Sequence, residues 1–163
     1  DFRAAERTFQ LLTQVAGRAG RGSEGGRVLV QTWNPRTPAI ACAVGHDYAG
    51  FSEIELDRRR ALGYPPFTRM LAVRIEALDA HAARSCAEAL AEAARPALSP
   101  ELSLLGPAPA AIERIRGRTR WHLLFKAADP AALRRAHGAL LPVARRPPGG
   151  AQVRFDVDPY AML

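Results

Sequence analysis

Two consecutive prolines, in the segment Gly63-Tyr64-Pro65-Pro66-Phe67, mark the predicted boundary between two domains of this chain. Each proline ring fixes the backbone dihedral φ and disfavours helix at the residue before it, so no regular element can run through the segment. We therefore predict a stiff joint between two domains, residues 1–62 and 63–163. The alternative is a polyproline ligand for another protein, although an aromatic-proline corner packed within the chain accounts for the same residues.

The composition limits the partners and the cellular setting. The chain has 163 residues, of which 48% are apolar, enough for one domain or for one domain and part of another. Its net charge is +7 and only one of its 23 basic residues is a lysine, which favours anionic partners such as nucleic acid or nucleotide phosphates. Cys42 and Cys86 form no C-x-x-C motif, so they indicate buried thiols in a reducing cytosol. No apolar run approaches the length of a membrane span.

The first domain is expected to be α/β. Residues 2–17 have the apolar spacing of an amphipathic helix, and 27–33 are nearly continuously apolar and β-branched, which is typical of a buried strand. Thr37-Pro38 predicts a helix over 38–44, and Asp47 can cap another over 48–62.

The end of the first helix carries the clearest candidate for catalysis. At 100° per residue, Gln14, Arg18 and Arg21 fall within a sector of about 60°, opposite the apolar face. Gly17 and Gly20 stand beside the two arginines, where glycine costs about 1 kcal/mol in a helix unless close approach of a ligand offsets it. Arginines held rigidly at a helix end can stabilise the charge of a transferring phosphoryl group. The alternative is a solvated basic helix end.

The second domain is expected to be α+β. Its elements would be strands over 70–75, 102–105 and 151–157, helices over 80–95 and 130–141, and a hairpin of 112–116 with 119–127 about Gly117. That order is β-α-β-β-α-β with an extra short strand, a ferredoxin-like arrangement.

The hairpin is the candidate contact for DNA. It carries five positive charges and no acid between residues 114 and 126, which suits a phosphate backbone read without sequence preference. Strand alternation predicts that Trp121 faces the core with Leu123 and Phe125, away from the basic side chains. An exposed edge protected by charge against aggregation is the alternative. The predicted DNA-binding residues are Arg114, Arg116, Arg118, Arg120 and Lys126, with His122 on the same face as the last three.

No metal site is predicted. Asp156 and Asp158 lie on one strand face, where a turn that pairs with nearby arginines is the simpler reading, and the four histidines share no ligand spacing. A phosphate loop needs a lysine after glycine, and the only lysine, Lys126, follows Phe125. This chain by itself is therefore expected to lack ATPase activity.

Four segments together indicate a family. The string Gln-x-x-Gly-Arg-x-Gly-Arg at 14–21 resembles motif VI of superfamily 2 helicases. In order along the chain, the segments resemble the C-terminal end of the PriA, or primosomal protein N′, family of replication-restart helicases. They are DFRAAERTFQLLTQVAGRAGRG, GRVLVQTWNP, HDYAGFSEIELDRRRALGYPPF and LLGPAPAAIERIRGRTRWHLLFK.

The resemblance implies a C-terminal fragment of an ATP-dependent 3′-to-5′ DNA helicase of the bacterial cytoplasm, associated with the nucleoid. Residues 1–62 would end the second RecA-like lobe, and 63–163 would form a DNA-binding domain. ATP with Mg²⁺ would bind mainly to an absent first lobe, with Arg18 and Arg21 catalytic and Gln14, Gly17 and Gly20 at the nucleotide. Zinc ligands would lie upstream of the fragment. Expected partners are forked and single-stranded DNA, primosome proteins and single-strand-binding proteins. The alternative is a nucleic-acid-binding or primosome-loading module without motor activity.

Overall fold

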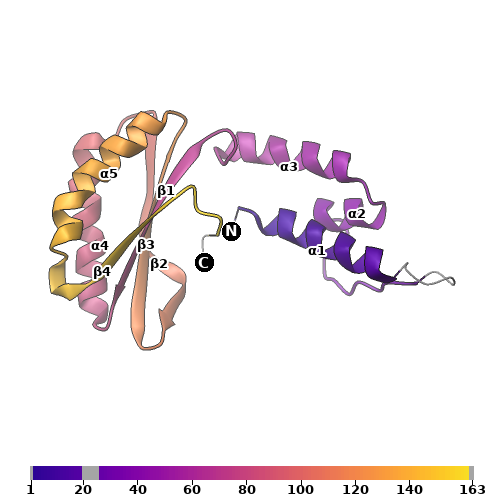
Figure 1. Cartoon of the computed structure of the whole chain (residues 1–163), viewed down its shortest axis with the longest axis horizontal. Helices are drawn as coiled ribbons and strands as arrows, with labels where there is room; N and C mark the ends of the chain where they lie inside the picture. The colour runs from indigo at the N-terminus through magenta and orange to yellow at the C-terminus, as the bar shows by residue number, and fades with distance from the viewer. Residues whose placement is uncertain (1, 20–25, 162–163) are drawn as a thin grey trace. The chain divides into compact units, whose positions relative to one another are not determined.

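The computed structural model describes residues 2–19 and 26–161. The chain forms two compact units, Asp1–Leu62 and Gly63–Leu163, and the division falls at the start of the Gly-Tyr-Pro-Pro-Phe segment (Figure 1). Its helices and its four-stranded antiparallel sheet make an α+β fold. None of the helices in the described ranges has the length and apolar character needed to cross a bilayer.

The first unit consists of helices α1 (Ala4–Ala19), α2 (Pro38–Val44) and α3 (Tyr48–Leu62), so the three predicted helices are confirmed. Their shared core is small. Phe9 of α1 stacks on Phe51 of α3, with ring centroids 4.4 Å apart and an interplanar angle of 1°, and Ala39 and Ala43 of α2 complete the buried cluster. Asp47 accepts a hydrogen bond from the backbone N–H of Gly50 at 2.8 Å, as expected for a helix cap.

The predicted strand over 27–33 is wrong for this chain. Residues 26–33 have no regular secondary structure, and Leu29 and Trp33 are 96% and 105% exposed. The physical reason is the lack of a neighbour, because the described part of this unit contains helices and no strand to which the backbone could hydrogen-bond. An apolar, β-branched run indicates which side chains a strand would bury. It forms a strand only where a neighbouring strand is available for backbone hydrogen bonds.

The second unit has the element order β-α-β-β-α-β, interrupted by two short 3₁₀ turns. Its sheet order is β2-β3-β1-β4, with every neighbouring pair antiparallel. The elements are β1 (Arg69–Ala77), α4 (Ala80–Ala94), η1 (Arg95–Ala97), β2 (Leu102–Ile115), β3 (Arg118–Ala127), α5 (Pro130–Arg145), η2 (Pro148–Gly150) and β4 (Gln152–Val157).

The core of the second unit lies between the sheet and its two helices. Both α4 and α5 lie on the same side of the sheet (Figure 1), and alternate strand residues point towards them. Full burial of each large apolar side chain contributes about 1.5–3 kcal/mol. The largest fully buried side chains of this core are Leu71, Val73, Ile75, Leu90, Leu102, Leu123, Phe125 and Leu140.

Both helices begin at an aspartate cap. Asp79 accepts hydrogen bonds from the backbone N–H groups of His81 and Ala82, and Asp129 accepts one from Ala131. Such caps typically contribute about 1 kcal/mol each.

The expected extra short strand is also wrong. Residues 102–105 and 112–115 belong to one strand, β2, whose pairing with β3 is interrupted by two shifts of register, after Leu105 and after Pro109. The prolines of the intervening stretch lack backbone N–H groups, and this explains why the sequence pattern reads as two strands. The predicted turn about Gly117 is confirmed, with a φ of 78° at that glycine.

Candidate nucleotide and nucleic-acid interfaces

Helix α1 presents the predicted polar face to the outside. Gln14, Gly17 and Arg18 are exposed, whereas Phe9 is buried on the face that packs against α2 and α3. A side-chain carbon added at Gly17 would meet no described atom within 4 Å, so packing inside this unit does not require glycine there. The other two members of the motif, Gly20 and Arg21, lie outside the described residues.

An ion-pair network fixes the beginning of α1 to α3. The Glu6 carboxylate accepts hydrogen bonds from Arg3 at 2.5 and 3.1 Å and from Arg59 of α3 at 2.9 Å. Arg59 also donates to Glu55 on its own helix at 2.9 Å. The hydrogen bonds from Arg3, together with Arg59, lower the pKa of Glu6 to about 2, although partial burial opposes them. Arg18 thus lies on α1, a helix that is fixed to α3 both by the ion pair of Glu6 with Arg59 and by the stacking of Phe9 on Phe51.

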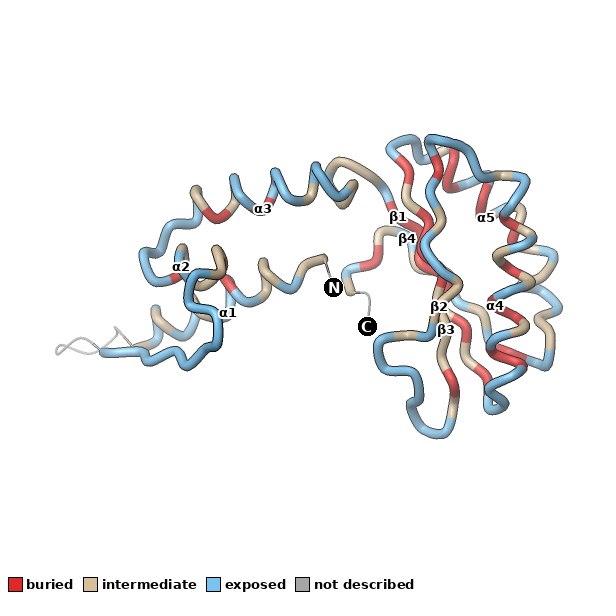
Figure 2. The backbone as a smooth tube through the Cα atoms, turned by 180° about the vertical axis from the view of Figure 1, so that it is seen from behind, coloured by how far each residue is buried: buried red, intermediate tan, exposed pale blue. Residues whose placement is uncertain are grey.

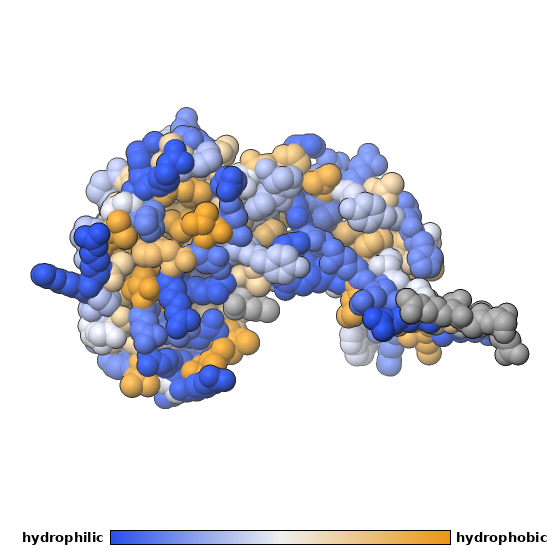
Figure 3. All heavy atoms as spheres, in the orientation of Figure 1, coloured by the Kyte–Doolittle hydropathy of each residue, from blue (hydrophilic) through white to orange (hydrophobic). Residues whose placement is uncertain are grey.

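The five predicted DNA-binding residues differ in exposure along the β2–β3 hairpin. Arg114 and Arg116 are exposed near the turn, and neither forms an ion pair with any residue in the described ranges. Arg118 is half-buried and lies opposite Ile115 across the hairpin. Figure 2 shows the end of this hairpin as a continuously exposed loop, and Figure 3 shows hydrophobic and hydrophilic side chains side by side over the lower part of this unit.

Arg120 and Lys126, further along β3, are engaged within the protein. The Arg120 side chain is only 13% exposed and its Nε lies 3.2 Å from Oε1 of Glu76 on β1. The Lys126 ammonium lies 4.4 Å above the centroid of the Tyr64 ring, which comes from the joint. Burial lowers the pKa of Lys126 from its ordinary value. These two side chains are therefore less available to a phosphate than Arg114 and Arg116, because they already contact other residues of this unit.

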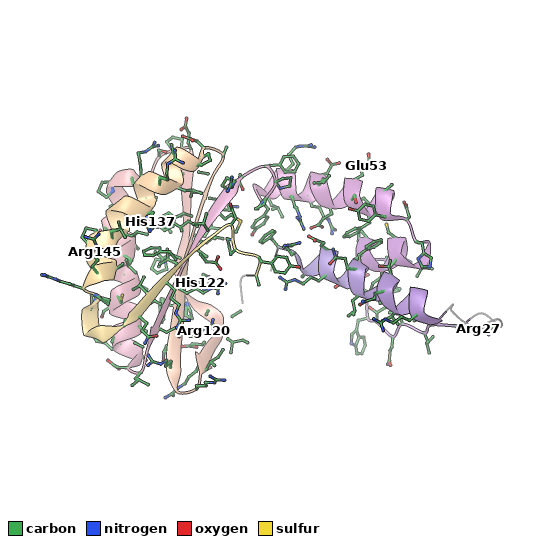
Figure 4. The ribbon with its side chains drawn as sticks, in the orientation of Figure 1. Arg27, Glu53, Arg120, His122, His137 and Arg145 are labelled. Carbon is green, nitrogen blue, oxygen red and sulfur yellow. The ribbon has the colours of Figure 1, made fainter. Side chains whose placement is uncertain are left out.

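His122 lies beside Arg120 along β3 (Figure 4). Its Nδ1 is buried and has no hydrogen-bond partner among the described residues. Burial also lowers the pKa of this imidazole, so the neutral form is favoured. Strand β2 approaches His122 closely at Gly106. A side-chain carbon added to that glycine would lie only 2.8 Å from the His122 carbonyl oxygen. The opposite parity is confirmed, since Leu123 and Phe125 are fully buried and Trp121 packs against the same core.

Two further arginines lie on the face of the sheet that points away from α4 and α5, which we call the helix-free face. They were not identified from the sequence as candidates for DNA binding. Arg74 of β1 pairs in register with His122 on one side and with Arg154 of β4 on the other. Arg74 donates to the Ala161 carbonyl oxygen at 2.7 Å and lies 3.3 Å from Asp156, whereas Arg154 is exposed. The alternation along β1 carried the signal, but the pairing of the strands was needed to bring these residues beside β3.

The C-terminal carboxylates pair with arginines, as the sequence predicted. Asp158 accepts hydrogen bonds from the Arg69 guanidinium, with Nε at 2.7 Å, and from the backbone N–H of Met70 at 3.0 Å. The Arg69 hydrogen bond is the main cause that lowers the pKa of Asp158. Across the parts of the chain that the structure covers, no group of three His, Cys, Asp or Glu side chains could hold a metal ion.

Comparison with known proteins identifies similar sequences over the whole chain. Residues 60–160 match the family model of the primosomal protein N C-terminal domain. The replication restart protein PriA of Synechocystis is 39% identical over 99% of this chain and 19% of its own length. The proteins of the same name from Treponema pallidum and Bacillus subtilis are 36% and 33% identical over 100% of this chain and 25% and 20% of their own lengths. The chain thus spans a quarter or less of each of these relatives.

Proposed function

The chain belongs to the family of the replication restart protein PriA, and we propose on that premise that its parent is an ATP-dependent 3′-to-5′ DNA helicase. The first unit is the end of the second RecA-like lobe. The second unit is a ferredoxin-like domain that binds DNA at stalled or repaired forks. Such a protein acts in the bacterial cytoplasm, at the nucleoid, with primosome proteins and single-strand-binding proteins as partners.

The observation that carries the ATPase proposal is the exposed row of Gln14 and Arg18 on α1, opposite the buried Phe9. A guanidinium on an anchored helix needs little reorganisation to reach a phosphate, and the open space over Gly17 permits close approach of a ligand. These residues, with Gly20 and Arg21, fit the terminal phosphates of ATP with Mg²⁺. Bound nucleotide would supply the phosphoryl group, and the arginines would stabilise the charge that develops on it.

DNA binding is supported by the charge distribution of the second unit. Arg114 and Arg116 are exposed near the hairpin turn and Arg154 on the helix-free face, while no acid lies between residues 114 and 126. Contacts of this kind bind phosphates without reading sequence. Zinc is expected only from ligands upstream of this chain.

Substitution in the full-length parent tests the ATPase proposal. Arg18→Ala and Arg21→Ala should each lower DNA-stimulated ATP turnover by about two or more orders of magnitude, with nucleotide affinity less affected. Arg58→Ala is the matched control, because Arg58 is an exposed arginine of α3 in the same unit. Turnover within about twofold of the parent in either variant would remove that residue from the catalytic set, whereas an absence of ATP turnover in the parent itself would favour a loading module without motor activity.

A further inference from the structure

The β2–β3 hairpin extends beyond the rest of the sheet. Pairing of β3 with β1 begins at Thr119, opposite Ala77, whereas Arg118 pairs only with Ile115 of β2. We call residues 110–118 the hairpin tip. On β2, four residues between Pro109 and Arg114 oppose a single residue of β3, so residues 110–113 lie outside the regular ladder.

The hairpin tip exposes two large aliphatic side chains among its charges. Ile112 is 51% exposed and Ile115 is 39% exposed, although isoleucine is among the residues most often buried. Arg114 and Arg116 flank Ile115 in the sequence, Arg118 pairs with Ile115 across the hairpin, and Glu113 is the one acid of the hairpin tip. The core of this unit does not cover either isoleucine.

The turn of the hairpin keeps a cation at a conformational cost. Both central residues, Arg116 and Gly117, have positive φ, at 49° and 78°. Asn, Asp and Gly are the residues preferred at the first of these positions, because a side chain such as that of arginine disfavours left-handed backbone. The sequence therefore places a guanidinium at the end of the hairpin, at a position where Asn, Asp or Gly would adopt this backbone conformation more readily.

We propose that the hairpin tip engages the junction between duplex and single-stranded DNA, with Ile112 and Ile115 packing against an unstacked base while the arginines hold the flanking phosphates. This inference rests on the proposed DNA binding and specifies which DNA structure this surface takes. Aliphatic side chains that enter a base step require partial unstacking, and a junction already offers bases with one free face. In a continuous duplex the arginines can contact phosphates, but the bases are stacked and leave no free face for the isoleucines.

Charge complementarity favours DNA over a second copy of the chain. Two hairpin tips would bring three arginines against three, with one glutamate on each side, and like charges held close together repel. A phosphate backbone matches the arginines instead, and the face of a base matches the isoleucines.

The test uses the 163-residue chain and a fork that carries 2-aminopurine at the last base pair before the junction. A saturating concentration of the chain should raise the 2-aminopurine fluorescence by about twofold or more on the fork. The rise should be far smaller on a fully paired duplex of the same sequence. The Ile112→Ser/Ile115→Ser variant should keep its affinity within about threefold and lose most of the rise. Leucine at both positions should restore the rise, because leucine keeps an aliphatic side chain there.

Val157→Ser is the matched control, since Val157 is 65% exposed on β4, at the opposite edge of the sheet. The inference is overturned if the parent chain binds the fork without a rise, if the serine variant keeps the rise, or if leucine fails to restore it. Serine-sensitive dimerisation in sedimentation, with no rise on DNA, would assign the isoleucines to a second copy instead. If the parent chain binds no DNA at all, the proposed DNA binding itself is refuted. The affinity measurement distinguishes this outcome from binding without a fluorescence rise.

Discussion

Glu6 joins two arginines from different parts of the first unit, and its environment makes it a stability determinant. Its side chain is 21% exposed and that of Arg59 is 13% exposed, so water screens this pair less than it would a surface pair. Because the folded state lowers the pKa of Glu6 from 4.5 to about 2, the stabilisation is fully present above pH about 4.5 and is lost as the pH falls towards 2.

We therefore expect Glu6→Gln to lower the free energy of unfolding of this unit by about 1–2 kcal/mol at pH 7, after allowance for the partial exposure of the pair. The difference between variant and parent should shrink as the pH falls below about 4.5. Hydrogen exchange of the amides in α1 and α3 reports the stability of this unit by itself. Glu53→Gln is the control, since Glu53 is exposed on α3 (Figure 4). An unchanged difference down to pH 3 would show that the carboxylate charge is not the cause.

At this scale, helical periodicity predicted the exposure of Gln14 and Arg18 correctly, because one helix determines it. The sequence does not distinguish the three consecutive arginines Arg58-Arg59-Arg60, yet only the middle one is partly buried. Arg59 turns inward to Glu6, which lies 53 positions earlier in the chain. In a run of consecutive arginines, the sequence alone does not indicate which one will form an ion pair with a residue on another helix.

Among the elements, the hairpin carries the test of DNA binding. Replacing Arg114 and Arg116 together by alanine should flatten the slope of log affinity against log salt by between about one and two units and weaken all sequences alike. Both side chains are exposed, so circular dichroism should show an unchanged fold. Arg120 is a poorer choice for substitution than its sequence position suggests, because its removal would leave Glu76 without its ion-pair partner.

Arg145→Ala/Arg146→Ala is the matched pair, since these adjacent exposed arginines lie at the end of α5, on the helical side of the sheet. The hairpin variant should lose affinity and the helix variant should retain it. Equal losses in both would mean that binding follows net charge and that the hairpin has no special part in it.

Alternation along β3 sufficed to predict which side chains enter the core, because a strand has two faces and one of them is apolar. The same reasoning failed at residues 27–33, where the apolar pattern is present and partner strands are absent from the described part of the unit. It also divided β2 in two, because prolines interrupt the pattern while the chain remains extended. Local pattern thus predicts the faces of an element, and pairing depends on other segments.

For the whole chain, the expected result is an absence of ATP turnover, with or without DNA. The sequence holds no phosphate loop, and its only lysine is on β3, above the Tyr64 ring. Phosphate release should stay at the level of the matched Arg18→Ala preparation, which controls for contaminating ATPases. Turnover that co-purifies with the chain and falls in that variant would refute the assignment of the chain to a part of the motor.

The ion pair between Arg69 and Asp158 has a consequence for how the second unit could be rearranged genetically. It places the start of β1 beside the end of β4, so the first strand of this unit begins where its last strand ends. A module with adjacent ends can be inserted into a loop of another protein with little disturbance, and it tolerates circular permutation. Joining its ends by a short linker and opening the chain at Gly117 would therefore preserve the sheet order while removing the covalent turn at the hairpin tip.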